Sequence, residues 1–440
     1  METWSPASWR ARPALQQPRY GDERQLAKVL ERLGRMPPLV SVGEIERLKV
    51  ELSQAARGER FVLQGGDCAE RFADCTSESV QRKLKILLQM SLVLTYGARK
   101  PVTRIGRLAG QFAKPRSQDT EVVDGVSLPV FRGDNVNGLE ATAAERAPDP
   151  LRLERGYFIS SATLNYVRAL VSGGFASLQA AEAWQLDFMP STSAYQGYRD
   201  LAHRIRDAID YLASLGGQAE VWRKVDFYTS HEGLVLAGEE ALTRIDPERR
   251  APYNLSCHFL WLGERTRALD GAHVEYFRGL RNPIGIKLGP KAQGDEVLAL
   301  LDRLDPDREP GRITLITRMG HQGIAEALPR LVRAVKAAGR TVVWSCDPMH
   351  GNTVTVQGKK TRDFLQITSE LEQAFAIHRA EGSVLGGVHF ELTGDNVTEC
   401  VGGAEGLGPL DLARSYETGC DPRLNYTQSL EMAFAMTRLL

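Results

Sequence analysis

An aspartate and a histidine follow a short apolar stretch late in this 440-residue sequence. Residues 342–344, Val-Val-Trp, are typical of a buried strand. Pro348 ends that strand, because proline lacks the N–H that a β-ladder needs. Asp347 and His350 lie at this end and just beyond it. Side chains at strand ends form the sites of many α/β enzymes, so the stretch predicts either a functional site or an ordinary turn.

Seven other apolar stretches end in the same way, with residues capable of chemistry. In chain order, the eight ends carry Cys68; Arg107 with Lys114, Arg116 and Ser117; His231 and Glu232; Glu264 and Arg265; Lys287; Arg318; Asp347 and His350; and Glu391. After a single strand, a charged residue is most often part of a solvated loop. Eight such ends favour one shared site at the mouth of a barrel.

Three of these residues could together bind a metal ion. Cys68, His350 and Glu391 offer a thiolate, an imidazole and a carboxylate, a set that suits a divalent transition metal. Their spacing is not diagnostic, because each follows a different strand. The residues alone therefore leave the metal site as one interpretation beside three unrelated buried side chains.

The same strand ends carry six cationic side chains. They are Arg107, Lys114, Arg116, Arg265, Lys287 and Arg318. The whole chain is neutral, with 55 Lys and Arg against 55 Asp and Glu, so this local excess would repel itself unless anions filled it. Arg suits the planar geometry of carboxylate and phosphate, and Lys adds a point charge. We expect a substrate set that carries several negative charges.

Composition and motifs exclude several functional classes. The zero net charge argues against a nucleic-acid or membrane-surface partner, and no apolar run is long enough to span a membrane. The first twenty residues hold no apolar signal core, and the six cysteines form no CxxC pair, so we expect a cytoplasmic protein with reduced thiols. No GxGxxG, Walker or GxSxG motif occurs at a strand end.

Short apolar strands alternate with amphipathic helices from residue 61 onward. We expect strands at Phe61–Gln64, Val102–Gly106, Phe227–Ser230, Phe259–Gly263, Ile284–Lys287, Ile313–Thr317, Thr341–Ser345 and Gly387–Glu391. Alternating strands and helices indicate a parallel sheet, and eight strands close a (β/α)8 TIM barrel. The alternative is an open, doubly wound sheet.

Two regions depart from this alternation. Two helical patterns precede the first strand, so we expect residues 1–58 to form an N-terminal helical extension of a catalytic barrel at residues 59–440. The stretch between the second and third strands is far longer than one helix requires, and it predicts a helical insertion at about residues 118–220. Its helices are expected at about 157–174 and 198–215, and both regions are candidates for subunit contacts or regulation.

The residues at the strand ends resemble those of class II 3-deoxy-D-arabino-heptulosonate 7-phosphate (DAHP) synthases. The matching segments are Phe61–Phe72 (FVLQGGDCAERF), Gly106–Ser117 (GRLAGQFAKPRS), Tyr228–Leu234 (YTSHEGL), Trp261–Asp270 (WLGERTRALD), Gly285–Pro290 (GIKLGP), Ile316–Gly320 (ITRMG), Trp344–Asn352, His389–Cys400 (HFELTGDNVTEC) and Cys420–Leu430 (CDPRLNYTQSL). They run from residue 61 almost to the C-terminus, in register and without a departure at any motif position.

The resemblance implies a fold, a reaction and a set of site residues. It implies a (β/α)8 barrel that condenses phosphoenolpyruvate with erythrose 4-phosphate, the first step of the shikimate pathway and of aromatic amino acid biosynthesis. It implies one divalent ion, Mn²⁺ or Co²⁺, held by Cys68, His350, Glu391 and Asp421. Arg107, Glu264, Arg265, Lys287 and Arg318 would then hold phosphoenolpyruvate, and Lys114, Arg116 and Ser117 would contact erythrose 4-phosphate. The catalytic residues would be Lys114, Glu264 and Lys287.

Several alternatives stay open at the level of sequence. Glu232 or Glu264 could activate the attacking water. A Schiff-base aldolase using Lys287 or Lys114, or a non-catalytic homologue acting as a regulator or scaffold, would be consistent with parts of the pattern. By family resemblance the chain would form a homo-oligomer, a dimer or tetramer, and could respond to aromatic amino acids. Cys420 precedes Asp421, so oxidation could join it to Cys68, although it could equally be a small buried residue.

Overall fold

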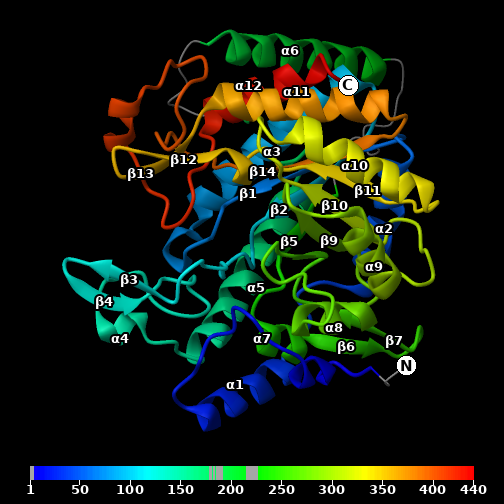
Figure 1. Ribbon diagram of the computed structural model, residues 1–440. Helices are drawn as coiled ribbons and strands as arrows, with labels where there is room; N and C mark the ends of the chain where they lie inside the picture. The colour runs from blue at the N-terminus through cyan, green and yellow to red at the C-terminus, as the bar shows by residue number, and fades with distance from the viewer. Residues whose placement is uncertain (1–3, 178–180, 182–183, 185–191, 215–225) are drawn as a thin grey trace.

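The protein is an eight-stranded parallel barrel surrounded by helices. The structure, a computed structural model, describes residues 4–177, 181, 184, 192–214 and 226–440. The barrel strands are β1 (Phe61–Gly66), β2 (Val102–Arg107), β5 (Tyr228–Glu232), β8 (Phe259–Leu262), β9 (Ile284–Leu288), β10 (Ile313–Thr317), β11 (Val343–Cys346) and β14 (Leu385–Glu391). They close in the order β1-β14-β11-β10-β9-β8-β5-β2 (Figure 1). All eight predicted strands and the TIM barrel are confirmed, and the open doubly wound sheet is wrong.

The barrel strands are buried on both faces, which explains why they read as apolar runs without alternation. The inward side chains include Val62, Ile105, Phe259 and Ile316, and they pack with Leu48, Leu52 and Ala55 of helix α2 (Val42–Ala56) in one apolar cluster. The carbonyl of Ala55 also lies against Gly386, which is near the start of β14. Helix α2 therefore covers the amino-terminal end of the barrel, and only the carboxyl end remains for a site.

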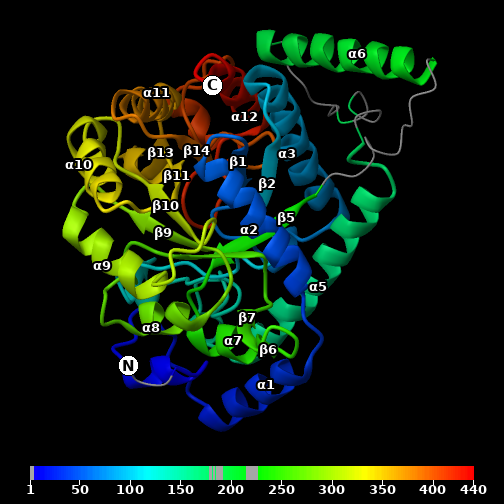
Figure 2. The ribbon, with the colours of Figure 1, turned by 90° about the vertical axis from the view of Figure 1, so that its right-hand side faces the viewer.

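The connecting helices form the outer layer (Figure 2). They are α3 (Ser77–Ala98), α7 (Leu236–Ala241), α8 (Ala272–Gly279), α9 (Gly294–Leu304), α10 (Ile324–Ala337), α11 (Phe364–Ala380) and α12 (Tyr426–Thr437). Their apolar faces join the largest core cluster, and α3 lies along α12, so the last helix of the chain closes against the first barrel helix. Among the described residues, no helix is long and apolar enough to cross a membrane.

The segment between β2 and β5 contains a β-hairpin as well as the expected helices. The hairpin pairs β3 (Thr120–Val123) with β4 (Val126–Pro129), and α4 (Ala143–Arg146), α5 (Leu151–Ser172) and α6 (Ser193–Ser214) follow. Parts of the predicted insertion, residues 178–180, 182–183, 185–191 and 215–220, lie outside the described residues, as does the expected end of α6 at Leu215. In Figure 2, α6 lies on the outside of the barrel beyond α3 and α12.

Two more hairpins were not expected from the sequence. Strands β6 (Thr243–Asp246) and β7 (Ala251–Asn254) form one, and β12 (Thr353–Val356) and β13 (Lys359–Arg362) form the other. In Figure 1 the β3–β4 and β12–β13 hairpins extend to the same side of the barrel, where the carboxyl ends of β2 and β11 lie. The β3–β4 and β12–β13 hairpins therefore lie beside the open mouth of the barrel.

The residues before the barrel form a segment that runs along it. Residues 4–20, which we call the N-terminal strap, include one turn of 3-10 helix at Ser8–Ala11 and precede α1 (Glu23–Arg35). Helix α1 packs against α5 and α7. Ser41 and Glu44 form a capping box at the start of α2, in which each side chain bonds the other residue's backbone N–H.

Candidate active site

A polar cavity opens at the carboxyl end of the barrel, and almost every predicted site residue lines it. Its volume is about 400 Å³, and its lining includes Cys68, Arg107, Lys114, Arg116, Ser117, Glu232, Glu264, Arg265, Lys287, Arg318, His350 and Asp421. Glu391 is fully buried beneath it. Residues spread over more than 300 positions of sequence thus meet in one place, as the strand-end pattern predicted.

Four of these residues form the bottom of the cavity, and we call Cys68, His350, Glu391 and Asp421 the floor. One ligand atom from each of Cys68, Glu391 and Asp421 lies within 4.8 Å of the other two. His350 joins them, with Nε2 3.1 Å from Glu391 Oε1. Cys68 follows β1, His350 follows β11, and Glu391 is the last residue of β14.

Asp421 reaches the floor because the chain beyond β14 turns back along its end. The N–H of Leu424 donates to the carbonyl of Glu391 at 3.0 Å, and the N–H of Thr393 donates to the carbonyl of Leu424 at 3.0 Å. This short bridge continues the edge of β14, and Asp421 lies three residues before it. Residue-level reasoning missed Asp421 because nothing local in the sequence specifies that pairing.

The orientation of the His350 ring is set by Asp347. His350 Nδ1 lies 2.7 Å from Asp347 Oδ2, which leaves Nε2 facing Glu391. Burial lowers the pKa of His350, while Asp347 and Glu391 oppose that shift. A neutral ring that donates from Nδ1 to a carboxylate presents its Nε2 lone pair, which is the arrangement of a metal-binding histidine. Asp347 thus supports the histidine instead of joining the floor.

Glu391 is held as a carboxylate by a ring of cations. Arg107 Nη2 lies 3.0 Å from Glu391 Oε1, and Arg362 Nη2 lies 2.8 Å from Oε2. Burial alone would raise the pKa of Glu391, but His350, Lys114 and the two arginines together lower it well below its usual range. The floor therefore keeps this negative charge although the side chain is wholly buried.

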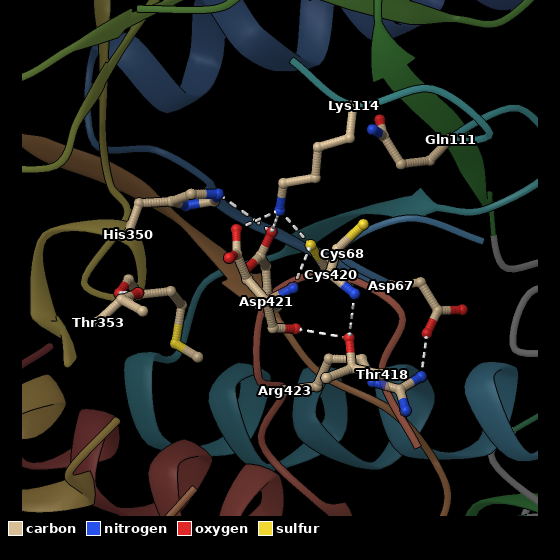
Figure 3. A network of polar contacts seen from close by, with 12 residues as sticks. Asp67, Cys68, Gln111, Lys114, His350, Thr353, Thr418, Cys420, Asp421 and Arg423 are labelled. Carbon is tan, nitrogen blue, oxygen red and sulfur yellow. Dashed lines mark hydrogen bonds and ion pairs between the residues drawn. The ribbon is translucent and has the colours of Figure 1, made fainter. Parts of the chain in front are cut away.

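The Lys114 ammonium lies among the floor residues (Figure 3). Its Nζ contacts Cys68 Sγ and lies 2.5 Å from Asp421 Oδ2 and 3.4 Å from Glu391 Oε1. Burial would lower the pKa of Lys114, but Asp421, Cys68 and Glu391 raise it well above its usual value. The floor thus attracts a cation strongly, and its sulfur, nitrogen and oxygen donors fit a divalent transition metal.

The two cysteines at the floor differ in acidity. Burial, the hydrogen bond to Cys420 and the neighbouring carboxylates raise the pKa of the Cys68 thiol well above its usual value. The hydrogen bond from Cys68, together with Lys114 and Arg116, lowers the pKa of Cys420 to about 7. Both cysteines are free thiols in this structure. Cys420 is therefore the more acidic of the two thiols, and a larger fraction of it is the nucleophilic thiolate.

Buried ion pairs beneath the floor fix the backbone next to two of its residues. Arg423, two residues after Asp421, lies 2.7 Å from Asp67 Oδ1 and 2.7 Å from Glu399 Oε1. Lys83 Nζ also contacts Asp67, the residue before Cys68. Figure 3 shows the bond between Asp67 and Arg423 below Cys420. Because these side chains are almost wholly buried, they hold the floor residues in place at a large cost of desolvation.

The predicted cations surround the cavity but are not equally available. Arg107 bonds His389 Nε2 at 2.7 Å, the carbonyls of Asp67 and Cys68, and Glu391, so its guanidinium is almost saturated. Lys287 Nζ donates to Asp347 Oδ2 at 3.0 Å, and burial lowers its pKa. Among the residues that the structure describes, Arg318 makes one long hydrogen bond, 3.4 Å to the carbonyl of His350, and its Nε has no hydrogen-bond partner. The structure therefore leaves Arg318 freer than Arg107.

Glu232 and Glu264, the two residues that the sequence leaves as alternatives for activating water, lie in different surroundings. Glu264 Oε2 accepts from the N–H of Gly289 at 2.7 Å, and Arg267 Nη2 lies 3.0 Å from Oε1. Glu232 has its Oε1 buried without a hydrogen-bond partner, and burial raises its pKa despite nearby Lys287 and Lys114. Both oxygens of Glu264 thus accept hydrogen bonds, whereas Glu232 Oε1 lies against Gly263 and has no hydrogen-bond partner among the described residues.

Some site residues were not anticipated. Trp261 lies under the Arg107 guanidinium at 5.3 Å and the Lys287 ammonium at 5.7 Å, and Lys360 Nζ lies 2.8 Å from Asp421 Oδ1. Arg362 and Gln111 also contact the site. Lys360 and Arg362 come from the unpredicted β12–β13 hairpin, and its Gln357-Gly358 turn was the available signal.

Comparisons with known proteins converge on one family. The model of the class-II DAHP synthetase family matches residues 4–437. A phospho-2-dehydro-3-deoxyheptonate aldolase of Streptomyces coelicolor is 49% identical over 98% of this chain and 96% of its own length. The one from Mycolicibacterium smegmatis is 44% identical over 98% of this chain and 93% of its own. A solved DAHP synthase of Thermotoga maritima aligns with a TM-score of 0.37 and 13% identity over 87% of this chain and 69% of that one, too distant to add to the argument.

Proposed function

Because the chain belongs to the class-II DAHP synthetase family, we propose that it condenses phosphoenolpyruvate with erythrose 4-phosphate and water, giving DAHP and inorganic phosphate. It is a 3-deoxy-7-phosphoheptulonate synthase by this membership. We also propose the substrates and the metal of this protein, the role of each site residue, and that the reaction begins aromatic amino acid biosynthesis.

One observation carries the proposal: an anionic floor of mixed donors lies inside a ring of cations. The floor suits a metal ion, and the ring suits two phosphates and a carboxylate. Both substrates are phosphorylated and one is a carboxylate, so they match this charge pattern. A Schiff-base aldolase would need a lysine free of such partners, and Lys114 is engaged by the floor while Lys287 is engaged by Asp347.

Cys68, His350, Glu391 and Asp421 would hold one divalent transition-metal ion, and the family resemblance favours Mn²⁺ or Co²⁺. When bound, such an ion polarises an aldehyde oxygen as a Lewis acid. The remaining steps fall to the chain's own residues, which bind and orient the substrates and move protons.

We assign phosphoenolpyruvate to the side of the cavity that holds Lys287, Arg265 and Arg318. Glu264 holds the loop of Arg265 in place, and Arg107 lies beneath the substrate. The aldehyde of erythrose 4-phosphate then lies beside Lys114, and its phosphate lies near Arg116 and Ser117. C3 of phosphoenolpyruvate attacks the aldehyde carbon, and the Lys114 ammonium donates a proton to the new alkoxide oxygen. These placements follow the charge of each group and its position on the cavity lining.

Water then adds to the cationic C2, and we assign its proton to Glu232. The free Oε1 and raised pKa of Glu232 make it a better base than Glu264, whose oxygens already accept from Gly289 and Arg267. Phosphate leaves from the resulting tetrahedral centre. Glu232→Gln should lower kcat about 100-fold with little change in either KM. A variant that keeps its full kcat would contradict this assignment.

The decisive experiment measures phosphate release from the two substrates with and without EDTA. We expect turnover by the metal-loaded enzyme, loss with EDTA and recovery with Mn²⁺ or Co²⁺. Borohydride treatment with substrate should trap no adduct on Lys114 or Lys287; a trapped lysine and EDTA-resistant turnover would favour the Schiff-base aldolase. A metal-loaded protein without turnover would favour the non-catalytic regulator or scaffold.

Cys68→Ser isolates the metal site within that experiment. The serine keeps the size of the side chain but is a poor ligand for a soft metal, so activity should fall at least about 100-fold while the circular dichroism spectrum is unchanged. The matched control is Cys75→Ser, since Cys75 lies seven residues away and does not line the cavity. A fully active Cys68→Ser enzyme would show that the metal assignment is wrong.

A further inference from the structure

A glutamine of the N-terminal strap clamps the loop that carries Arg116. Gln16 Nε2 donates to the carbonyl of Arg116 at 3.1 Å, and Gln16 Oε1 accepts from the N–H of Arg116 at 2.8 Å. The same oxygen accepts from Arg132 Nη1 at 3.1 Å. One side chain thus bonds both backbone groups of a single residue, 100 positions away in sequence.

The backbone of Gln16 adopts an unusual conformation to reach this place. Its φ is +62°, in the left-handed region that non-glycine residues rarely occupy. Such strain persists only where the surrounding contacts over-determine it, and it is found most often at sites that need a fixed geometry. The clamp on Arg116 is the contact that compensates for the strain at this position.

The strap itself is tied to the barrel on both sides of Gln16. The N–H of Ala272 donates to the carbonyl of Pro13 at 3.0 Å, which fixes the strap to the start of α8. The Gln17 amide donates to the carbonyl of Leu234 at 2.8 Å and accepts from the N–H of Leu236 at 3.0 Å, which fixes it to the start of α7. Gln16 is therefore held against the barrel frame, and the loop is held against Gln16.

Backbone hydrogen bonds hold the loop on either side of Arg116, from Lys114 to the carbonyl of Arg132 and from Val130 to the carbonyl of Asp119, but the side chain of Arg116 itself is held only weakly. Its guanidinium makes only long contacts, 3.8 Å to Cys420 Sγ and 3.7 Å to Glu121 Oε2. The side chain is 22% exposed and lines the cavity, as Glu121 does. Because the side-chain contacts are weak, the position of the Arg116 backbone decides where its charge lies.

From these contacts we propose that Gln16 is a positioning residue for the substrate phosphate, acting through the backbone of Arg116. The strap thereby completes the active site from outside the barrel, although no residue of the strap lines the cavity. This inference rests on the proposed function, because it takes Arg116 as a ligand of the erythrose 4-phosphate phosphate.

The test uses Gln16→Gly in the full-length, metal-loaded enzyme. Glycine accepts a positive φ without strain, so the substitution removes the clamp while keeping the path of the strap. We expect the KM for erythrose 4-phosphate, and its dissociation constant measured by calorimetry, to rise about tenfold, the effect of losing one or two hydrogen bonds. The KM for phosphoenolpyruvate and kcat should change less than twofold.

Gln17→Ala is the matched control, because it removes two backbone hydrogen bonds of the same kind from the neighbouring residue. If the strap only stabilised the fold, both variants would lower the free energy of unfolding to a similar extent and leave the KM for erythrose 4-phosphate unchanged, and this result would overturn the inference. Gln16→Gly should also lose most of its effect in an Arg116→Ala background, since both act through one contact. Additive effects of the two substitutions would likewise overturn it.

The outcomes separate this inference from the proposed function. An active wild type with an unchanged erythrose 4-phosphate KM in Gln16→Gly overturns the role of Gln16 and leaves the function intact. A wild type that binds erythrose 4-phosphate but does not turn over removes the function, while the calorimetric comparison of the variants still decides the clamp. A wild type that binds no erythrose 4-phosphate overturns both.

Discussion

The floor and the outer wall of the cavity are built on opposite principles. We define the outer wall as residues 115–121, the part of the loop after β2 that carries Arg116 and Ser117. The floor residues come from strand ends or pair with one, and charged partners buried beside them hold them in place. The outer wall is half-buried or exposed, and it is held by Gln16 of the strap, which bonds Arg116, and by Arg146 of α4, which pairs with Glu121.

This difference separates two energetic roles. Burying charged side chains close together in the floor lowers the free energy of unfolding. A bound metal ion would offset this loss by neutralising the negative charges. The outer wall keeps the charge of Arg116 near water, where it can bind an anion with little loss of folding free energy. Damage to the floor should therefore affect stability and turnover together, and damage to the outer wall should affect only the binding of one substrate.

Oxidation should break the floor most completely. In metal-free enzyme treated with hydrogen peroxide, the Cys420 thiolate, with its pKa lowered to about 7, should be oxidised first and then condense with Cys68, releasing water. The disulfide removes a floor ligand, so nearly all activity should be lost and a thiol reductant should restore it. Peptide mass mapping would identify the pair.

The metal-loaded enzyme is the control for that experiment, because a bound ion would shield Cys68. Cys75 and Cys400 serve as internal references, since burial raises the pKa of each. Two free thiols at positions 68 and 420 after complete inactivation would remove this explanation.

Glu391→Gln should show the coupled effect on stability and turnover. It leaves Arg107 and Arg362 buried beside a neutral amide, which should cost about 3–5 kcal/mol of unfolding free energy. Activity should fall at least about 100-fold through loss of a metal ligand. Urea unfolding of the metal-free protein and phosphate release measure the two quantities.

Glu121→Gln is the matched change on the outer wall. Glu121 is 32% exposed and lies near Arg116 and Arg146, so its loss should cost less than about 1 kcal/mol. Equal losses of stability in the two variants would show that the distinction between floor and outer wall is wrong.

The sequence predicted the floor better than the outer wall, for a physical reason. Cys68, His350 and Glu391 could be found because the barrel aligns the ends of all its strands, so a local pattern predicts a long-range contact. Asp421 entered only through the resemblance, since its place depends on Leu424 pairing beside β14. No local pattern predicts which backbone groups Gln16 bonds, because it lies in an irregular segment.

The β3–β4 hairpin is a different kind of omission, because its signal was present. Asp124-Gly125 separates Val122-Val123 from Val126, and Asp-Gly between β-branched residues is a strong hairpin signal. The long insertion led to an expectation of helices alone. The hairpin supplies Glu121, so this part of the outer wall was predictable in principle.

Stability should also depend on pH through a buried glutamate of α11 that holds the loops next to the floor. Glu370 accepts from the N–H groups of Met319 and Gly320 and from Asn352 Nδ2, and so joins the loops after β10 and β11. Burial raises the pKa of Glu370 to about 7 from 4.5. Because the unfolded chain releases this proton at lower pH, the folded protein loses stability as pH rises between these values.

The loss should reach at most about 3 kcal/mol across that window. Urea unfolding of wild type and Glu370→Gln at pH 5 and pH 8 isolates it, since the remaining titrating groups are common to both proteins. The wild type should lose more stability between the two pH values than the variant does. The same pH dependence in both would show that Glu370 ionises as an ordinary carboxyl.

Ser117→Ala, at an exposed position of the outer wall, should have the smallest effect on substrate binding. Ser117 is exposed, and its hydroxyl accepts from Arg265 Nη2 at 2.8 Å. Because a neutral hydroxyl in contact with water contributes about 0.5–1 kcal/mol, the KM for erythrose 4-phosphate should rise about threefold with stability and kcat unchanged. A larger rise in the KM for phosphoenolpyruvate would instead mean that Ser117 acts by holding Arg265, and that the outer wall serves both substrates. Arg265→Lys, which keeps the charge but loses the planar geometry, distinguishes the two, because it should raise the KM for phosphoenolpyruvate alone.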